Sequence, residues 1–126
     1  MANKNKNEYE IELNNKKYTL RATFDFFMNV ESELNKSFTE LAMDSEKGKT
    51  TFNEAFVIIR EGLNANNNSL SDDEIKSAIL QNGLLTTTLQ IQELMLVATY
   101  GGSALELLHK HSPLDDSKEE EVIKKK

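Results

Sequence analysis

The sequence contains no cysteine and no tryptophan, and only one proline occurs among its 126 residues. Without cysteine the chain has no disulfide, no thiol nucleophile and no thiolate ligand for a metal, so its stability must come from packing. No stretch approaches the run of about 20 apolar residues that a membrane-spanning helix needs, and we expect a soluble protein with no membrane partner. A chain of 126 residues has room for one domain, which argues against a multidomain enzyme.

Positive charge is scarce as well. The chain has 15 lysines and arginines against 21 aspartates and glutamates, which gives a net charge of -6. An excess of negative charge repels a phosphate backbone, and a DNA-recognition helix needs exposed basic residues, so we expect no nucleic-acid partner. Lysines occur near the start, but no apolar stretch follows them. A signal peptide and a lipidation site are therefore not expected, and the expected location is a cytoplasm.

The first periodic segment alternates apolar and polar residues, as a half-buried β-strand does. Asn14 and Asn15 divide it into two halves, and asparagine tolerates the positive φ of a tight turn, so the pattern predicts a β-hairpin. Pairing on one face allows a loop of two or four residues, which places Ile11 opposite Tyr18 or opposite Leu20. The side chains expected to face inward are Tyr9, Ile11, Leu13, Tyr18, Leu20 and Ala22.

From Thr23, the expected cap of the first helix, the apolar period becomes helical. Three further helices are predicted to start at Ser37, Thr51 and Ser71, because each is followed three residues later by glutamate, as in a capping box. All six phenylalanines lie within residues 24–56, so we expect the densest aromatic packing among the first helix, the third helix and the hairpin. The expected core residues are Phe26, Phe27, Val30, Leu34, Phe38, Leu41, Ala42, Phe52, Ala55, Phe56, Ile59, Leu63, Ile75, Ala78 and Ile79.

Residues 84–100 differ, because apolar side chains lie most of the way round the predicted helix. Such a helix is either the central element of the bundle or presents a face to another chain, and both interpretations stay open. Leu85, Leu89 and Leu96 define a second apolar face, and a last helix is predicted after its cap, Ser103. The residues that we assign to a partner contact are Leu84, Ile91, Leu94, Met95, Ala98, Leu105 and Leu108.

These patterns predict a mainly α fold, a small bundle of five to six helices preceded by an N-terminal β-hairpin. The hairpin is expected over residues 8–22 and the whole domain over residues 8–112. Residues 1–7 are polar and residues 113–126 are mostly charged. Segments of this composition have little to bury, so we expect both ends to be disordered.

The sequence offers little that predicts chemistry. Residues 46–50 end like a phosphate-binding loop, but Met43 stands where the first glycine of that loop is required. His109 and His111 are expected on opposite sides of a helix, where they cannot share one metal ion. We therefore expect no catalytic residue, no metal site and no cofactor, and we interpret the chain as an interaction protein rather than an enzyme.

Part of the sequence is similar to a known family. The similarity is carried by residues 13–23, which read LNNKKYTLRAT, then by Phe27 and by residues 30–38, which read VESELNKSF. These segments resemble the tail assembly chaperones of long-tailed, siphovirus-type bacteriophages and the related protein of gene transfer agents. In that family a hairpin of the type L-x-G-x-x-Y-x-L-R leads into a helix, an L-E-x-x-x-G-x-S segment, a short helix and a turn.

The resemblance extends over residues 10–83 and includes the turn at residues 48–51 and the segment that leads to Ser71. Asn15 and Asn35 stand where the family often has glycine, and asparagine can also take a positive φ. The shared pattern consists of caps, turns and core residues rather than of catalytic residues.

The resemblance implies a non-enzymatic factor that acts during tail assembly in the cytoplasm of the bacterial host and is absent from the mature virion. Such a factor binds and solubilises the long, helix-rich tape measure protein and helps to recruit tail tube subunits around it. An acidic surface with one apolar face suits this role, because it can cover a hydrophobic stripe of a partner and release it later. We expect residues 84–108 to make the contact.

The family often has a longer form that is made by a programmed ribosomal frameshift. The three lysines at residues 124–126 are compatible with an A-rich slippery sequence, so a frameshifted longer form is a hypothesis, as is self-association. The alternative function is a structural head–tail connector or a minor tail component of a phage particle. Presence in purified virions distinguishes this alternative from the chaperone.

Overall fold

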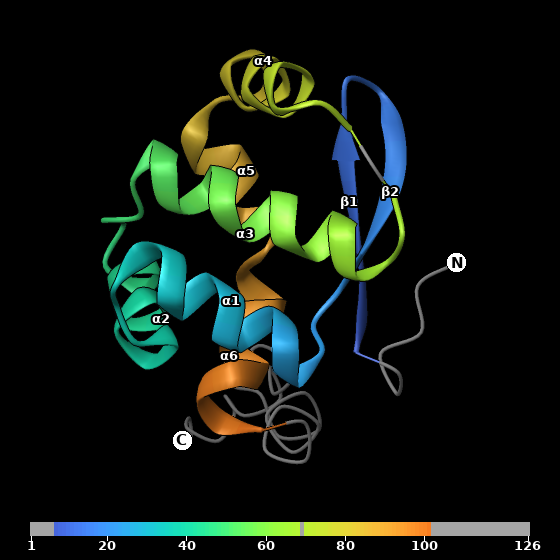
Figure 1. Ribbon diagram of the computed structural model, residues 1–126. Helices are drawn as coiled ribbons and strands as arrows, with labels where there is room; N and C mark the ends of the chain where they lie inside the picture. Colours follow the sequence, from blue (N-terminus) through green and yellow to red (C-terminus); the bar gives the residue numbers. More distant parts are fainter. Residues whose placement is uncertain (1–6, 69, 102–126) are drawn as a thin grey trace, which may run out of the picture.

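A computed structural model describes residues 7–68 and 70–101 (Figure 1). Within these residues a two-stranded antiparallel sheet precedes six helices, which confirms the predicted fold class. The predictions for residues 1–6 and 102–126, including the last helix with Leu105 and Leu108, lie outside the described residues. The elements are β1 (Glu8–Leu13), β2 (Lys16–Arg21), α1 (Phe24–Leu34), α2 (Phe38–Glu46), α3 (Phe52–Ala65), α4 (Asp72–Asn82), α5 (Leu84–Gln90) and α6 (Gln92–Tyr100).

The hairpin has the shorter of the two predicted loops. Ile11 lies opposite Tyr18, and the loop is the pair Asn14 and Asn15, whose φ angles are 54° and 65°. Two consecutive residues with positive φ match the twist of a tight hairpin, which explains why asparagine serves here. Of the predicted inward residues, Tyr18 is half-buried and the others are buried, which are Tyr9, Ile11, Leu13, Leu20 and Ala22.

The predicted caps start the first four helices. Each cap hydroxyl accepts a hydrogen bond of 3.0 or 3.1 Å from the backbone N–H three residues later. The capping box is complete at α3 and α4. At α2 only the half made by the Ser37 hydroxyl is present, and the Phe38 N–H donates to Glu31 Oε2 at 2.8 Å. The four caps are Thr23, Ser37, Thr51 and Ser71.

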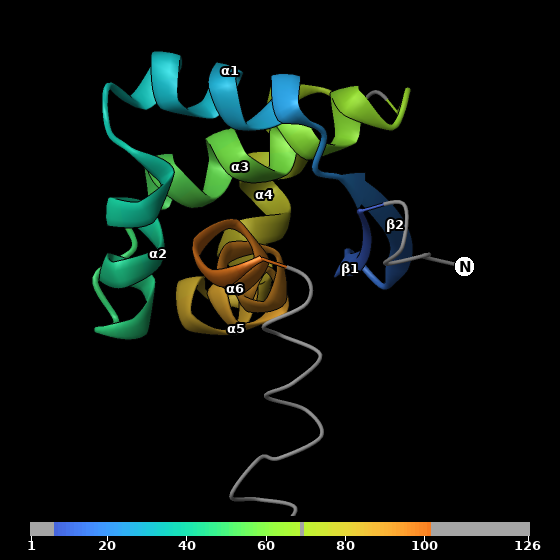
Figure 2. The ribbon, with the colours of Figure 1, turned by 90° about the horizontal axis from the view of Figure 1, so that it is seen from below.

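The core is built around α3. This helix packs against β2, α1, α4 and α5, and Figures 1 and 2 show it running through the middle of the molecule. Ala55, Ile58 and Ile59 are fully buried. A Cβ atom at Gly62 would lie 2.9 Å from the Cβ of Leu20, so the glycine allows α3 to approach β2 closely. The central helix is therefore α3 and not the segment 84–100.

One predicted core residue of α3 is on the surface. Phe52 is 54% exposed, although it has the same helical spacing as the buried Ala55 and Ile59. It is the first residue of the helix, and its side chain lines a surface groove with residues of α4. Burial on this face therefore begins one turn later than predicted.

The aromatic packing also differs from the prediction. Phe27 lies edge-on to Phe26 and to Phe38, with ring centroids 5.0 and 4.9 Å apart, so the aromatic cluster joins α1 to α2. Phe56 of α3 lies instead between two cations, with Arg60 at 5.1 Å and Lys76 at 5.2 Å from its ring centroid. The hairpin and α3 contribute no phenylalanine to the aromatic cluster of the described residues.

Residues 84–100 form two helices rather than the single helix predicted. The break is at Ile91, whose φ and ψ are -99° and 6°. The hydroxyls of Thr87 and Thr88 donate to the carbonyls of Gly83 and Leu84, and hydrogen bonds of this kind bend helices. The bend lets α6 pack against α2 while Ile91 remains buried at the junction.

Two side-chain amides tie the hairpin to the helices. The N–H of Glu12 donates to Gln90 Oε1 at 2.8 Å, and Gln90 Nε2 donates to the Glu12 carbonyl at 3.2 Å. Asn82 Nδ2 donates to the same carbonyl at 3.2 Å. These bonds hold β1 against the α4–α5 segment. None of the helices in residues 7–68 and 70–101 is long and apolar enough to cross a membrane.

Candidate functional site

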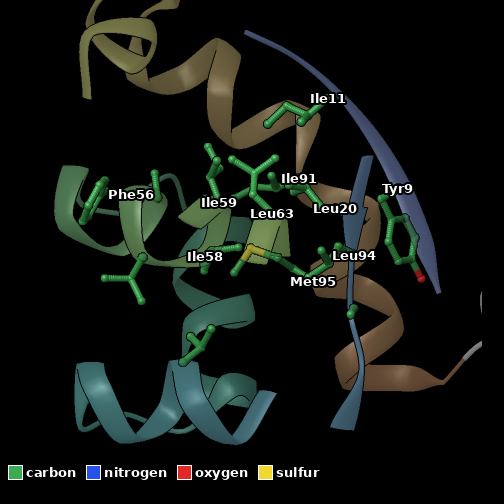
Figure 3. Packing of buried hydrophobic residues seen from close by; sticks show 14 of the residues in the cluster. Tyr9, Ile11, Leu20, Phe56, Ile58, Ile59, Leu63, Ile91, Leu94 and Met95 are labelled. Atoms are coloured by element: carbon green, nitrogen blue, oxygen red, sulfur yellow. The ribbon is translucent and has the colours of Figure 1, made fainter. Parts of the chain in front are cut away.

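The predicted partner contact lies largely inside the molecule. Ile91, Leu94 and Met95 are each 1% exposed and belong to the core cluster, whereas Leu84 and Ala98 are partly buried against it. Figure 3 shows the first three pointing toward α3 and β2. The sequence left open whether this face packs in the core or contacts another chain, and the burial of these residues shows that it packs in the core. Leu105 and Leu108 lie outside the described residues.

The second apolar face of the same segment is open. Leu85 is 68% exposed and Leu89 is 60% exposed. Both line a cleft of 530 Å³ between α5 and the end of α2, which we call the α2–α5 cleft. The described residues that line it are Ser45, Glu46, Gly48, Thr50, Leu84, Leu85, Thr88, Leu89 and Gln92.

Two hydroxyls stand out in the wall of the α2–α5 cleft. Ser45 Oγ and Thr50 Oγ1 are buried and have no hydrogen-bond partner. An unpaired buried hydroxyl is costly, because it has lost its bonds to water. The lining of the cleft thus combines apolar leucines from α5 with polar groups from α2 and from the turn after it.

A second recess lies on the other side of the α3 N-terminus. It has a volume of 280 Å³ and opens between α3 and α4, and we call it the α3–α4 groove. Phe52 and Leu80, which are 54% and 72% exposed, form its rim. Its lining within the part of the chain that the structure describes is Phe52, Asn53, Phe56, Lys76, Ile79 and Leu80.

The two recesses are neighbours. Thr50 lines the α2–α5 cleft and Phe52 lines the α3–α4 groove, so the chain crosses from one to the other within three residues. In Figure 1 this end of α3 is on the left, with α2 below it and α4 above it. We call the combined surface the apolar end of the molecule.

A partly buried ion-pair cluster connects the helices at the apolar end. Lys36 Nζ lies 2.6 Å from Asp44 Oδ2 and 2.8 Å from Glu54 Oε2, which joins the end of α1 to α2 and α3. The hydrogen bond from Lys36 lowers the pKa of Asp44, and the hydrogen bonds to Asp44 and Glu54 raise the pKa of Lys36. Glu54 Oε1 also accepts the Thr51 N–H at 3.0 Å, so the same carboxylate orders the helix start.

The exposed residues of the apolar end were not predicted as a contact. Leu80 follows Ile79 and lies out of phase with the buried face of α4, and Phe52 stands directly after the cap of α3. The position of Leu80 on the polar side of α4 is a signal that could have identified it, whereas Phe52 has the spacing of a core residue and offers no such signal. The signal in residues 84–100 was the second face, which contains Leu85 and Leu89.

The described residues offer no evident catalytic arrangement. Within residues 7–68 and 70–101 no group of three or more His, Asp or Glu side chains could hold a metal ion. The two histidines of the chain lie outside this part. Searches against known protein families, curated protein sequences and solved structures find no match to the chain.

Proposed function

We propose that this chain is a non-enzymatic binding protein that holds an amphipathic helix of another protein at its apolar end. The observation that supports this proposal is the distribution of exposed apolar side chains. Eight large hydrophobic residues are exposed in the described part of the chain, and four of them line the two recesses. These four are Phe52, Leu80, Leu85 and Leu89.

The chemistry of the surface suits a helical ligand. An amphipathic helix presents apolar side chains at positions i, i+3, i+4 and i+7, and such a row fits an apolar groove bordered by polar groups. Glu46 and Gln92 border the α2–α5 cleft, and Asn53 and Lys76 border the α3–α4 groove. The net charge of -6 would keep a complex with an apolar partner in solution.

Together with the family resemblance, this surface supports a role as a tail assembly chaperone. The partner that we propose is the tape measure protein, a long and helix-rich chain whose apolar stripes need cover before the tail tube closes around it. The proposed chaperone would act in the cytoplasm of the bacterial host, help to recruit tail tube subunits, and leave before the virion is complete.

The test is co-expression with the tape-measure-like protein encoded beside the gene of this chain. We expect the partner to be soluble and to copurify with the unaltered chain. Leu89→Glu should abolish both, because it places a charge in the α2–α5 cleft. Met28→Glu is the matched control, since Met28 is 51% exposed on α1 and lines neither recess.

Two outcomes of this experiment would contradict the proposal. If Leu89→Glu and Met28→Glu capture the partner equally well, the apolar end is not the binding surface. If the partner ignores the unaltered chain and the chain is instead found in purified particles, the connector function replaces the chaperone function.

A further inference from the structure

Two cations contact the ring of Phe56, and they differ in their ion pairs. Arg60 forms ion pairs with Glu33 and Glu61. Lys76 lies on the other helix of the α3–α4 groove, with its Nζ 5.2 Å from the Phe56 ring centroid. No carboxylate of the described residues pairs with it. The Phe56 ring thus contacts one cation that is held in ion pairs and one that forms no ion pair with the described residues.

The position of Lys76 places this charge in an apolar surrounding. Among the described residues, the groove is lined by Lys76, Asn53 and the apolar side chains of Phe52, Phe56, Ile79 and Leu80. The aspartates at residues 72 and 73 lie one turn earlier on the same helix, yet neither forms an ion pair with Lys76. Lys76 is exposed to solvent, and its contact with the Phe56 ring favours a position of the ammonium beside the groove.

We propose that the α3–α4 groove selects an acidic amphipathic helix, in which an apolar side chain enters the groove and a carboxylate one turn away pairs with Lys76. Side chains three or four residues apart on a helix lie about 5–6 Å from each other. An anchor between Phe52 and Leu80 therefore brings the next turn of the ligand toward Lys76. This inference rests on the proposed helix-binding function and specifies the partner that the groove accepts.

A preference of the α3–α4 groove for acidic helices would be opposite to what the net negative charge of the protein favours. The net charge of -6 repels acidic ligands at long range. A preference for glutamate over lysine must therefore come from a local cation. This separates the proposed contact from general electrostatic attraction, which would favour basic helices.

A displayed library of 18-residue single helices provides the test. Each helix has a fixed leucine stripe at positions i, i+3, i+4 and i+7, and Glu, Gln or Lys is allowed at the flanking positions. The library is selected on the full chain, on Lys76→Glu, on Lys76→Gln and on Lys16→Glu. Lys16 is the matched control, because it is exposed on β2 and lies outside both recesses.

We expect glutamate to be enriched over lysine about fivefold next to the leucine stripe, the factor that a single favourable ion pair supplies. Lys76→Gln should remove this preference and Lys76→Glu should reverse it, whereas Lys16→Glu should retain it. If glutamate is enriched equally on Lys76→Glu, or if lysine is enriched on the unaltered chain, the inference is wrong.

A fifth selection separates this inference from the proposed function. Leu80→Glu blocks the α3–α4 groove and leaves the α2–α5 cleft intact. Helices that bind without charge preference, and bind Leu80→Glu as well, would retain the proposed function and overturn the inference. A library from which no helix is retained on any of the proteins would overturn both.

Discussion

The two apolar faces of residues 84–100 have the same kind of side chain and opposite surroundings. Ile91, Leu94 and Met95 are covered by α3 and β2, whereas Leu85 and Leu89 face a cleft. The difference arises from the neighbours and not from hydrophobicity, because leucine occurs on both faces. The inner face stabilises the fold, and the outer face is exposed among the described residues.

The largest effect is expected on the inner face. Leu94→Ala removes a side chain that is 1% exposed, and a truncation of this kind leaves a cavity that the surrounding structure fills only in part. We expect the free energy of unfolding to fall by about 2–5 kcal/mol. Urea unfolding followed by circular dichroism measures it. A loss below about 0.5 kcal/mol would mean that this face is not core.

A smaller effect is expected where the ion pairs hold the walls of the cleft. Lys36→Met leaves Asp44 and Glu54 without their cation, so the variant should be less stable than the unaltered chain at neutral pH. Lys16→Met, an exposed lysine on β2, should change little.

The pH dependence of this variant has a defined sign. The lowered pKa of Asp44 contributes stability above the ordinary aspartate pKa of about 3.9, and the contribution is lost as the pH falls through the lower, folded-state value. The raised pKa of Lys36 contributes stability that is fully present below the ordinary lysine pKa of about 10.4. The difference between the two proteins should therefore be constant near pH 7 and shrink toward pH 2. A difference that stays constant to pH 2 would contradict the ion-pair explanation.

The junction between the two helices should be sensitive to its amide anchor. Gln90→Ala removes both bonds to the Glu12 peptide group, and we expect the free energy of unfolding to fall by about 1 kcal/mol. Amide hydrogen exchange at Glu12 should accelerate, because its N–H loses its acceptor. Thr86→Ala, an exposed position of α5, is the control and should leave that exchange rate unchanged.

The smallest effect on stability is expected on the outer face. Leu89→Gln changes a side chain that is 60% exposed, so the free energy of unfolding should change by no more than about 0.5 kcal/mol. Capture of a helical partner should nevertheless fall. A thermal melt measures the stability, and a binding assay on the same preparation measures the capture of the partner. Loss of stability comparable to that of Leu94→Ala would remove the distinction between the faces.

Local patterns in the sequence predicted local structure well. Alternation fixed the inward face of the hairpin, and the caps at Thr51 and Ser71 predicted the starts of α3 and α4. Steric and hydrogen-bonding rules over three or four residues are sufficient for these features. The buried residues of α4 followed from the same helical periodicity.

Features that depend on distant neighbours were not predictable in the same way. Periodicity showed that residues 84–100 have two apolar faces, but which face is covered depends on where α2 and α3 lie. Phe52 has core spacing but is exposed, because it lies in a surface groove between α3 and α4 rather than in the core. Lys76 contacts Phe56 only because α4 packs against α3, and the local pattern of either helix does not specify that packing. Such contacts between elements are set by packing and not by local pattern.

The amide anchor at Glu12 has a consequence for behaviour at high concentration. An unpaired strand edge is a template for strands of other molecules, and such pairing leads to aggregation. At Glu12 of β1 the N–H already donates to Gln90, and the carbonyl already accepts from Gln90 and Asn82. An incoming strand would have to displace these side chains before it could pair there. The same side chains that hold β1 to the helices therefore also block strand pairing at this point of the sheet edge.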